Sequence, residues 1–352
     1  MDNSRKLLHR CSLVLFLGGA NLFAESRSSK LLRLVIRIWL IIAMFYQIYQ
    51  RVLSIATFGG GLKSCTSFTY FVLMTVCFSC LIRKSDKLES FLTLLVRGMD
   101  DVDHNKANRF VRLTQAVYVS QIIVISLLNF HRRSPSSFLQ VSIKSAGTTV
   151  GDVVSAICSL SSYWVAASCL FYCTVAYIMS LFHKRQLEVL FLTLKHNDID
   201  YRSVRTIISS LRLTFQTFER MLSFLPFIWF LYGIITSAGS IHSLFRDPGN
   251  PLRLCYMLHD YLMPILVVVM VARLCDKFVA LLDQPIDLVA SNRCMELADK
   301  LQLQRDMDML KATKLTGMSY FTLDRSFIVS YVGSVLTFAA LIAGFAEKQT
   351  TT

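Results

Sequence analysis

Long apolar blocks, separated by short charged stretches, are the feature that most constrains this sequence. A helix needs about 20 apolar residues to cross a hydrocarbon core of about 30 Å, and seven blocks approach or exceed that length. They cover residues 34–58, 65–82, 111–130, 150–182, 222–245, 253–282 and 326–345. Only 17% of the residues are charged, against about 25% in soluble domains. The sequence therefore predicts an all-α membrane protein with seven transmembrane helices and argues against a soluble enzyme.

The basic residues are distributed unequally between the two sides that these spans define. Four segments hold 24 Lys and Arg residues, whereas the segments on the other side hold 6. The four basic segments are residues 1–33, 83–109, 183–221 and 283–320. Because basic loops stay in the cytoplasm, we expect the N-terminus inside and the C-terminus outside. The net charge of +14 then follows from the topology, and we expect no nucleic-acid partner.

These spans divide the chain into five parts. They are a cytoplasmic N-terminal segment (1–33), a six-helix ligand-binding bundle with cytoplasmic extensions (34–282), a cytoplasmic anchor helix (283–325), the last transmembrane helix (326–345) and an extracellular tail (346–352). The outer loops are short, so a ligand from outside has to enter the helix bundle itself. Apolar residues interleaved with charges in residues 286–314 predict an amphipathic cytoplasmic helix. Its apolar stripe serves either packing within one chain or assembly of several chains.

Residue patterns typical of enzymes are absent from the sequence. It contains no nucleophile elbow, no phosphate-binding loop and no zinc-protease motif. Cys77 and Cys80 form a single C-x-x-C inside an apolar block, and His183 and His196 are isolated in the cytoplasmic part. We therefore expect no catalytic residues, no metal and no cofactor. A cytoplasmic N-terminus also argues against a G-protein-coupled receptor, which shares the count of seven helices.

Small and polar residues form a stripe along the last span. Ser326, Ser330, Gly333, Ser334 and Thr337 recur at spacings of three and four, so they share one face of a helix. A polar stripe on a membrane helix needs a partner or water. The stripe either packs closely against another helix or lines an aqueous pore. One such helix cannot enclose a pore, so the second interpretation requires an oligomer.

Part of this helix resembles the signature of the arthropod gustatory receptors. That signature is Thr-Tyr, five mostly apolar residues and then Gln-Phe; here Ser330-Tyr331 and Thr337-Phe338 stand at its two ends. Seven spans, an inner N-terminus, short outer loops and long cytoplasmic helices extend the resemblance to essentially the whole chain. The chain is similar to a short, divergent member of these chemoreceptors. The resemblance implies a taste receptor that acts as a ligand-gated, non-selective cation channel in the plasma membrane of sensory neuron dendrites.

The resemblance also implies that four chains, identical or related, surround one central pore. The last helix of each chain lines this pore through Ser330, Ser334, Thr337, Phe338 and Leu341. Thr337 takes the place of the Gln in the signature, and Ser334 lies one turn earlier. Because a Ser side chain does not repel water, Phe338 or Leu341 has to form the gate, or a second kind of subunit supplies it.

The ligand pocket of this family lies in the outer half of each bundle, between the second and sixth helices. Candidates at that depth are Tyr70, Gln121, Asn129, Tyr163, Trp164, Tyr232, Ser237 and His259. The Tyr and Trp side chains equally suit anchors at the membrane surface. The expected partners are thus a small-molecule ligand, monovalent and divalent cations, membrane lipid and other copies of the receptor.

A second class of function stays open from the sequence. An accessory subunit without its own conductance, or a transporter, would show the same spans. A transporter often consists of two related halves or has broken helices with charges at mid-membrane, and the sequence shows neither pattern. Conductance together with oligomeric state separates these alternatives.

Overall fold

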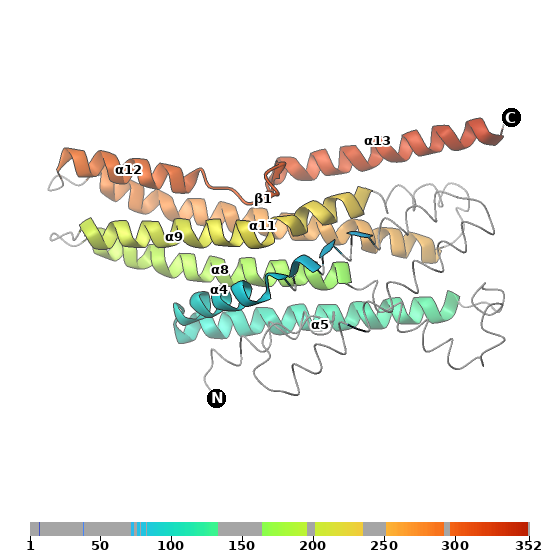
Figure 1. Ribbon diagram of the computed structural model, residues 1–352, viewed down its shortest axis with the longest axis horizontal. Helices are drawn as coiled ribbons and strands as arrows, with labels where there is room; N and C mark the ends of the chain where they lie inside the picture. Colours follow the sequence, from blue (N-terminus) through green and yellow to red (C-terminus); the bar gives the residue numbers. More distant parts are fainter. Residues whose placement is uncertain are drawn as a thin grey trace.

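The computed structural model is an elongated bundle of long helices (Figure 1). It describes residues 84–132, 164–195, 201–234, 251–291 and 296–350, together with Leu7, Ile38 and eight positions between 72 and 83. In chain order the elements are α4 (Ser85–Arg97), α5 (Asp101–Arg132), α8 (Trp164–Lys195), α9 (Tyr201–Leu222), α11 (Pro251–Ser291), α12 (Leu297–Lys311), β1 (Thr316–Gly317), β2 (Phe321–Thr322) and α13 (Arg325–Thr350). The predicted all-α class is confirmed for these residues, since the strands among them form a single two-residue pair.

Helix α8 is the centre of the bundle. It contacts α4, α5, α9 and α11, and Figure 1 shows α5, α8, α9 and α11 running along the long axis of the molecule. Every residue from 167 to 176 on α8 is buried, as expected for a helix that is apolar on all sides. Within this core, the Tyr172 ring makes edge contacts with Phe218 and Trp229, at centroid distances of 5.1 and 5.3 Å.

The helices continue beyond the predicted spans. α5 begins at Asp101, α8 continues to Lys195 and α11 continues to Ser291. α9 lies largely outside the predicted spans and is amphipathic, with Val204 and Ile208 on its buried face. Because the apolar faces of α8 and α9 pack on each other, charged sequence around them still folds as long helices.

A break separates α9 from the next helix, which spans residues 224–234. Pro226 explains the break, because it has no N–H to donate to the carbonyl of Leu222 and its ring clashes with that carbonyl in a continuous helix. Lys84 stabilises the end of α9: its Nζ donates to the carbonyls of Arg220 and Met221 at 2.8 and 3.2 Å. A cation is favourable there because the helix dipole is negative at a C-terminus. The predicted fifth span therefore begins at a helix break.

The segment predicted as one anchor helix consists of two helices. Residues 286–291 are the end of α11, and α12 is a separate helix that packs against α11 and α9. The buried face of α12 consists of Leu303, Met307 and Leu310. At the surface, Lys311 Nζ lies 2.6 Å from Asp283 Oδ1 and joins α12 to α11.

A short hairpin joins α12 to α13, which lie end to end along one edge of the bundle in Figure 1. Thr316 pairs with Thr322 in the antiparallel pair of β1 and β2. Met318 and Ser319 in the turn have positive φ angles of 50° and 65°, which are unfavourable for residues that carry a Cβ. The sequence analysis did not predict this hairpin.

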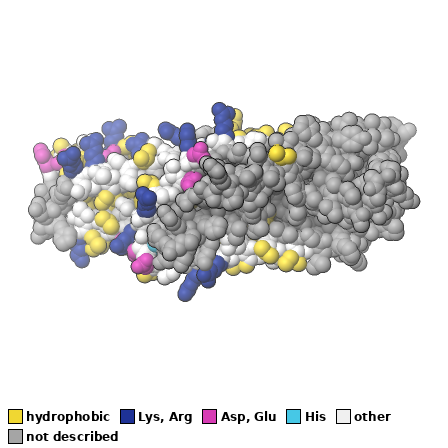
Figure 2. All heavy atoms as spheres, turned by 60° about the horizontal axis from the view of Figure 1, so that its bottom comes forward, with side chains coloured by type: hydrophobic (Ala, Val, Ile, Leu, Met, Phe, Trp, Pro, Cys, Tyr) yellow, Lys and Arg dark blue, Asp and Glu magenta, His cyan; other side chains and the backbone are white. Residues whose placement is uncertain are grey.

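Of the helices that the structure describes, none combines the length and the apolar character of a membrane span. The seven spans and their orientation stay predictions from the sequence. Figure 2 shows Lys and Arg side chains spread over the described part of one face.

Candidate functional site

The candidate site is the exposed face of α13, and its position depends on how this helix begins. Asp324 caps the helix: its Oδ1 accepts the N–H of Phe327 at 3.1 Å and the hydroxyl of Ser326 at 2.6 Å. Its Oδ2 accepts the hydroxyl of Thr322 at 2.8 Å, and the Lys314 Nζ lies 3.6 Å away. The Ser326 hydroxyl contributes most to lowering the pKa of the Asp324 carboxyl, which is about 2. The carboxylate is therefore ionised and caps α13 at any physiological pH.

One face of α13 packs against the helix of residues 224–234. Phe327 and Tyr331 are buried, and their rings lie 5.6 and 5.7 Å from that of Phe230. Gly233 allows the closest approach, because a Cβ there would overlap the Tyr331 hydroxyl and lie 2.8 Å from its Cζ. Tyr331 therefore fixes α13 to the helix of residues 224–234 in its own bundle.

The five residues predicted to line a pore lie on the exposed part of α13. Ser330, Ser334 and Thr337 are exposed in the single chain, as are Phe338 and Leu341. Phe338 and Leu341 leave 43% and 54% of their surface uncovered. The single chain therefore leaves this polar and apolar face without cover from its own bundle.

The hydroxyl groups on this face donate their hydrogens to the helix backbone. Ser330 donates to the carbonyl of Ser326 at 3.2 Å, and Ser334 donates to the carbonyl of Ser330 at 2.8 Å. Thr337 donates to the carbonyl of Gly333 at 2.8 Å. Each hydroxyl oxygen still has a lone pair for a second contact. The face is thus a row of hydrogen-bond acceptors, which suits water and cations.

The structure describes one of the eight candidate ligand-binding side chains. Tyr232 is buried, with 7% of its surface exposed, and belongs to the hydrophobic core. Gln121 and Asn129 lie on α5, Trp164 begins α8 and His259 lies on α11, but their side chains are outside the described residues. Tyr70, Tyr163 and Ser237 also lie outside the described residues. The ligand pocket stays a prediction.

A small apolar cavity lies beside the beginning of α13. Its walls are Pro226, Trp229, Val267, Val268 and Leu323, and the space between them is small and partly open to the surroundings. The Trp229 indole N–H in this wall donates to the Ser168 hydroxyl on α8 at 2.9 Å. The cavity contains none of the predicted ligand-binding residues.

His183, which stands apart from other His residues in the sequence, is a structural residue in the interior of the described bundle. Its ring is 1% exposed and packs beside Phe215 and Phe278, at centroid distances of 4.5 and 5.1 Å. Its Nε2 lies 2.6 Å from the Thr214 hydroxyl, which donates its own hydrogen to the carbonyl of Leu211 at 2.8 Å. Nε2 must therefore carry the hydrogen of this contact. Burial lowers the pKa of His183 to about 3, so the ring is neutral and ties α8 to α9.

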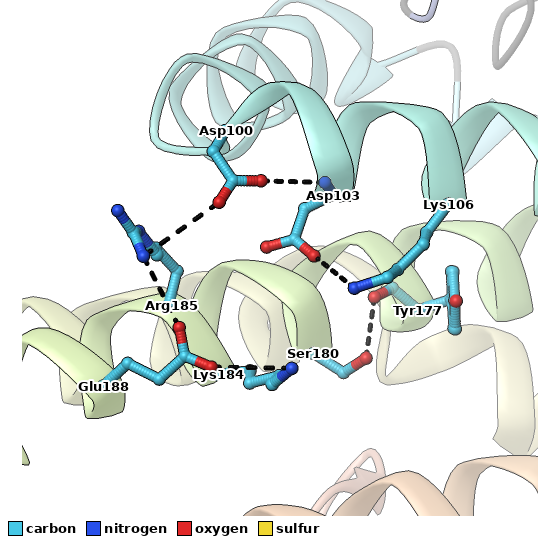
Figure 3. A network of polar contacts seen from close by, with 8 residues as sticks. All are labelled: Asp100, Asp103, Lys106, Tyr177, Ser180, Lys184, Arg185 and Glu188. Atoms are coloured by element: carbon cyan, nitrogen blue, oxygen red, sulfur yellow. Dashed lines mark hydrogen bonds and ion pairs between the residues drawn. The ribbon is translucent and has the colours of Figure 1, made fainter.

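A charged network joins the beginning of α5 to α8 (Figure 3). Asp100 accepts the N–H of Asp103 at 2.8 Å and lies 4.0 Å from Arg185. Arg185 lies 3.5 Å from Glu188, and Lys106 lies 3.1 Å from Asp103. The backbone hydrogen bond from Asp103 is the main reason that the pKa of Asp100 is lowered. Asp103 is buried, whereas the other charged groups of the network are largely exposed, and exposed pairs contribute little to stability. We therefore interpret the network as a cap at the beginning of α5.

No family model matches the chain, and no curated protein matches its sequence. Solved structures do match it over nearly its whole length. The insect olfactory receptor OR5 from Machilis hrabei in complex with eugenol superposes with a TM-score of 0.70, covering 98% of this chain and 100% of the receptor chain at 16% identity. A second structure of the same receptor gives a TM-score of 0.68, covering 97% of this chain and 99% of the receptor chain at 14% identity.

The chain has the fold of an insect olfactory receptor. The expected resemblance to insect-type chemoreceptors is therefore confirmed for the fold, whereas the narrower gustatory assignment stays a prediction. An identity of 14–16% carries the fold alone, so residue roles have to be argued from this chain.

Several residues that hold the site were missed from the sequence. Asp324 had a readable signal, because an acidic residue directly before an apolar helix is a common cap. Pro226 also marked the helix break. Gly233 and Glu219, whose contacts are with α13 and the hairpin before it, had no such signal because those contacts form only in the folded chain.

Proposed function

We propose that the chain is a chemoreceptor and forms a ligand-gated, non-selective cation channel. Four chains, identical or related, would surround a pore lined by the exposed face of α13. The observation that carries the proposal is this face itself: hydroxyl oxygens and two large apolar side chains lie uncovered on a helix whose adjoining face, with Phe327, Tyr331 and Val335, is buried. The shared fold with an insect olfactory receptor supports the receptor class.

The chemistry of this face suits weakly selective cation passage. Its hydroxyl hydrogens are held by helix carbonyls, so the oxygens can replace part of the hydration of a cation. Between Ser326 and Ala346 the sequence has no charged residue. Without fixed charges, discrimination among monovalent cations is expected to be weak, and anion selectivity would contradict the proposal.

The ligand is expected to be a small organic molecule that binds within the helix bundle. The similar olfactory receptor has been solved with eugenol, a small phenol. In this chain the eight candidate residues, with Tyr232 the described one, would form the pocket. The gustatory-like signature at the last helix favours a tastant as this compound.

Gating would follow from the way in which α13 is held. A ligand shifts the equilibrium only if it binds the open arrangement more tightly than the closed one. Movement of the helix of residues 224–234 would carry α13 with it, because Tyr331 and Phe230 pack together and Gly233 permits close approach. The exposed Phe338 and Leu341 would then separate from their counterparts on the other chains, and the pore would fill with water.

The proposal is tested by recording from cells that express the chain and comparing Leu341→Ala with Leu336→Ala. Both leucines are more than half exposed on α13, but five helical residues place them roughly 140° apart. Leu341→Ala should give a basal cation current, and Leu336→Ala should not. Thr337→Arg should abolish the basal current of Leu341→Ala. Surface tetramers without current would favour a heteromeric channel, and surface monomers would refute the proposal.

A further inference from the structure

The hairpin before α13 is held by one carboxyl group from α9. Glu219 accepts the backbone N–H of Thr316 at 3.0 Å through Oε1 and at 3.2 Å through Oε2. The Thr316 hydroxyl donates to Oε1 as well. A second contact lies beside the first, since the N–H of Met318 donates to the carbonyl of Ser223 at 3.1 Å. Both contacts join the hairpin to the last residues of α9 and to the break that follows.

The hydrogen bonds between Glu219 and Thr316 connect onward to the first turn of α13. Thr316 pairs with Thr322 across the two strands, and the Thr322 hydroxyl donates to Asp324 at 2.8 Å. Asp324 in turn accepts the N–H of Phe327 in α13. A continuous series of hydrogen bonds and one strand pair therefore links Glu219 on α9 to the N-terminus of the proposed pore helix.

The α9 end of this series is fixed. Lys84 binds the carbonyls of Arg220 and Met221, directly after Glu219. Pro226 prevents the helix from continuing past this point. A change at Glu219 is therefore transmitted toward the hairpin rather than absorbed by movement of α9.

The surroundings of Glu219 are poor in positive charge. Tyr172 on α8 and Cys275 on α11 lie within electrostatic range of its carboxyl group. Two basic groups near α9 and the hairpin have other contacts: Lys84 binds backbone carbonyls at the end of α9, and Lys314 lies beside Asp324. The neighbouring Arg220 side chain points to the exposed surface. Partial burial raises the pKa of Glu219, although the hydrogen bonds from Thr316 oppose this.

We propose that Glu219 is a positioning residue: its hydrogen bonds to Thr316 form a joint that couples α9 to the start of α13. The proposal deepens the channel function above and rests on it for its effect on current. Three hydrogen bonds from Thr316 end on the two oxygens of the Glu219 carboxyl group. Removing this acceptor should therefore free the hairpin and, with it, the first turn of α13.

Hydrogen–deuterium exchange of purified protein in detergent tests the joint without any need for current. Glu219→Ala should speed exchange of the peptide covering residues 315–324 about tenfold, since two or more hydrogen bonds are lost. Thr316→Val should have a similar but smaller effect, and the double variant should be little faster than Glu219→Ala. Glu188→Gln is the matched control, because Glu188 is an exposed carboxylate on α8 without contact to the hairpin.

Glu219→Gln separates the hydrogen bonds from the size of the side chain, because the amide keeps one oxygen acceptor and replaces the other with a donor. It should speed exchange of residues 315–324 relative to wild type, but less than Glu219→Ala does. Unchanged exchange in both Glu219→Ala and Thr316→Val would overturn the proposal.

Recording from inside-out patches tests the coupling to α13. In the Leu341→Ala background, which needs no ligand for its basal current, Glu219→Ala should change that current by about tenfold, and Glu188→Gln should leave it unchanged. Faster hairpin exchange with unaltered current would overturn the coupling. If exchange is faster in the variants but the protein never conducts, the positioning role of Glu219 is supported and the channel function is refuted.

Discussion

Replacing Gly233 with alanine should push α13 away from the helix of residues 224–234. The new Cβ would overlap the Tyr331 hydroxyl and lie 2.8 and 3.1 Å from Cζ and Cε2 of that ring. An unstrained carbon contact is about 3.5–4.0 Å. The ring has little room to turn, because Tyr331 is 2% exposed and lies 5.7 and 6.2 Å from the Phe230 and Phe327 rings. The strain therefore falls on the contact between the two helices.

The size of the effect follows from two opposing terms. Overpacking a core costs about 1–3 kcal/mol, whereas alanine in place of a helical glycine recovers up to about 1 kcal/mol. Gly333→Ala on α13 is the matched control, since no atom lies within 4 Å of a Cβ at that position. The control variant therefore gains the helix propensity of alanine without any cost of overpacking. Gly233→Ala should thus be about 1–3 kcal/mol less stable than Gly333→Ala.

Thermal unfolding of the purified variants in detergent measures this difference. Tyr331→Leu removes the ring atoms that the new Cβ would meet, so in that background Gly233→Ala should become neutral or stabilising. The cycle isolates the contact from the cost of the shortened side chain. Equal unfolding temperatures for Gly233→Ala and Gly333→Ala, or no rescue by Tyr331→Leu, would refute the idea that this contact holds α13.

Three further predictions concern the residues that fix the helix ends and the core. Asp324→Ala should lower the free energy of unfolding by about 1 kcal/mol. Because the pKa of Asp324 is about 2 against an ordinary 3.8, this contribution should be complete above pH 4 and vanish as the pH falls to 2. Unfolding temperatures measured across this pH range test it. His183→Gln should flatten the pH dependence of the free energy of unfolding below pH 6.5. In the wild type the unfolded chain binds a proton at this histidine, whereas the buried ring, with a pKa of about 3, stays neutral. An unchanged slope would contradict this. Lys84→Met should loosen the end of α9 by about 0.3–1 kcal/mol, seen as faster hydrogen exchange at residues 217–223, and Lys84→Arg should restore protection.

Helices could be predicted from this sequence, but many of their ends could not. The apolar blocks located α5, α8, α11 and α13, because a long apolar run has few alternatives to a helix. α8 and α11 extend past the predicted limits, to Lys195 and Ser291, since their ends pack on the neighbouring helices α9 and α12. The break at Ser223 was readable from Pro226, whose missing N–H acts locally.

The exposed residues of the candidate site could be predicted from the sequence, but the residues that hold α13 in place could not. Spacing alone put Ser330, Ser334 and Thr337 on one face of a helix, and the structure leaves them exposed. The same spacing cannot say that Tyr331 packs on Gly233, because their meeting depends on two helices far apart in sequence. The hairpin at Thr316–Thr322 likewise escaped the sequence analysis. Its turn uses positive φ at Met318 and Ser319, which are not the residues that usually mark such turns.

The most direct measurement for the central claim is chemical modification of α13 during recording. Cysteine introduced at Thr337 should react with a water-soluble cationic thiol reagent, and the reaction should block the current, faster with ligand than without. Cysteine at Leu336, also exposed in the single chain but on another part of the helix, should leave the current unchanged, as should the ten native cysteines in the wild-type control. Block at Leu336 without block at Thr337 would contradict the account, because a different face of α13 would then line the pore.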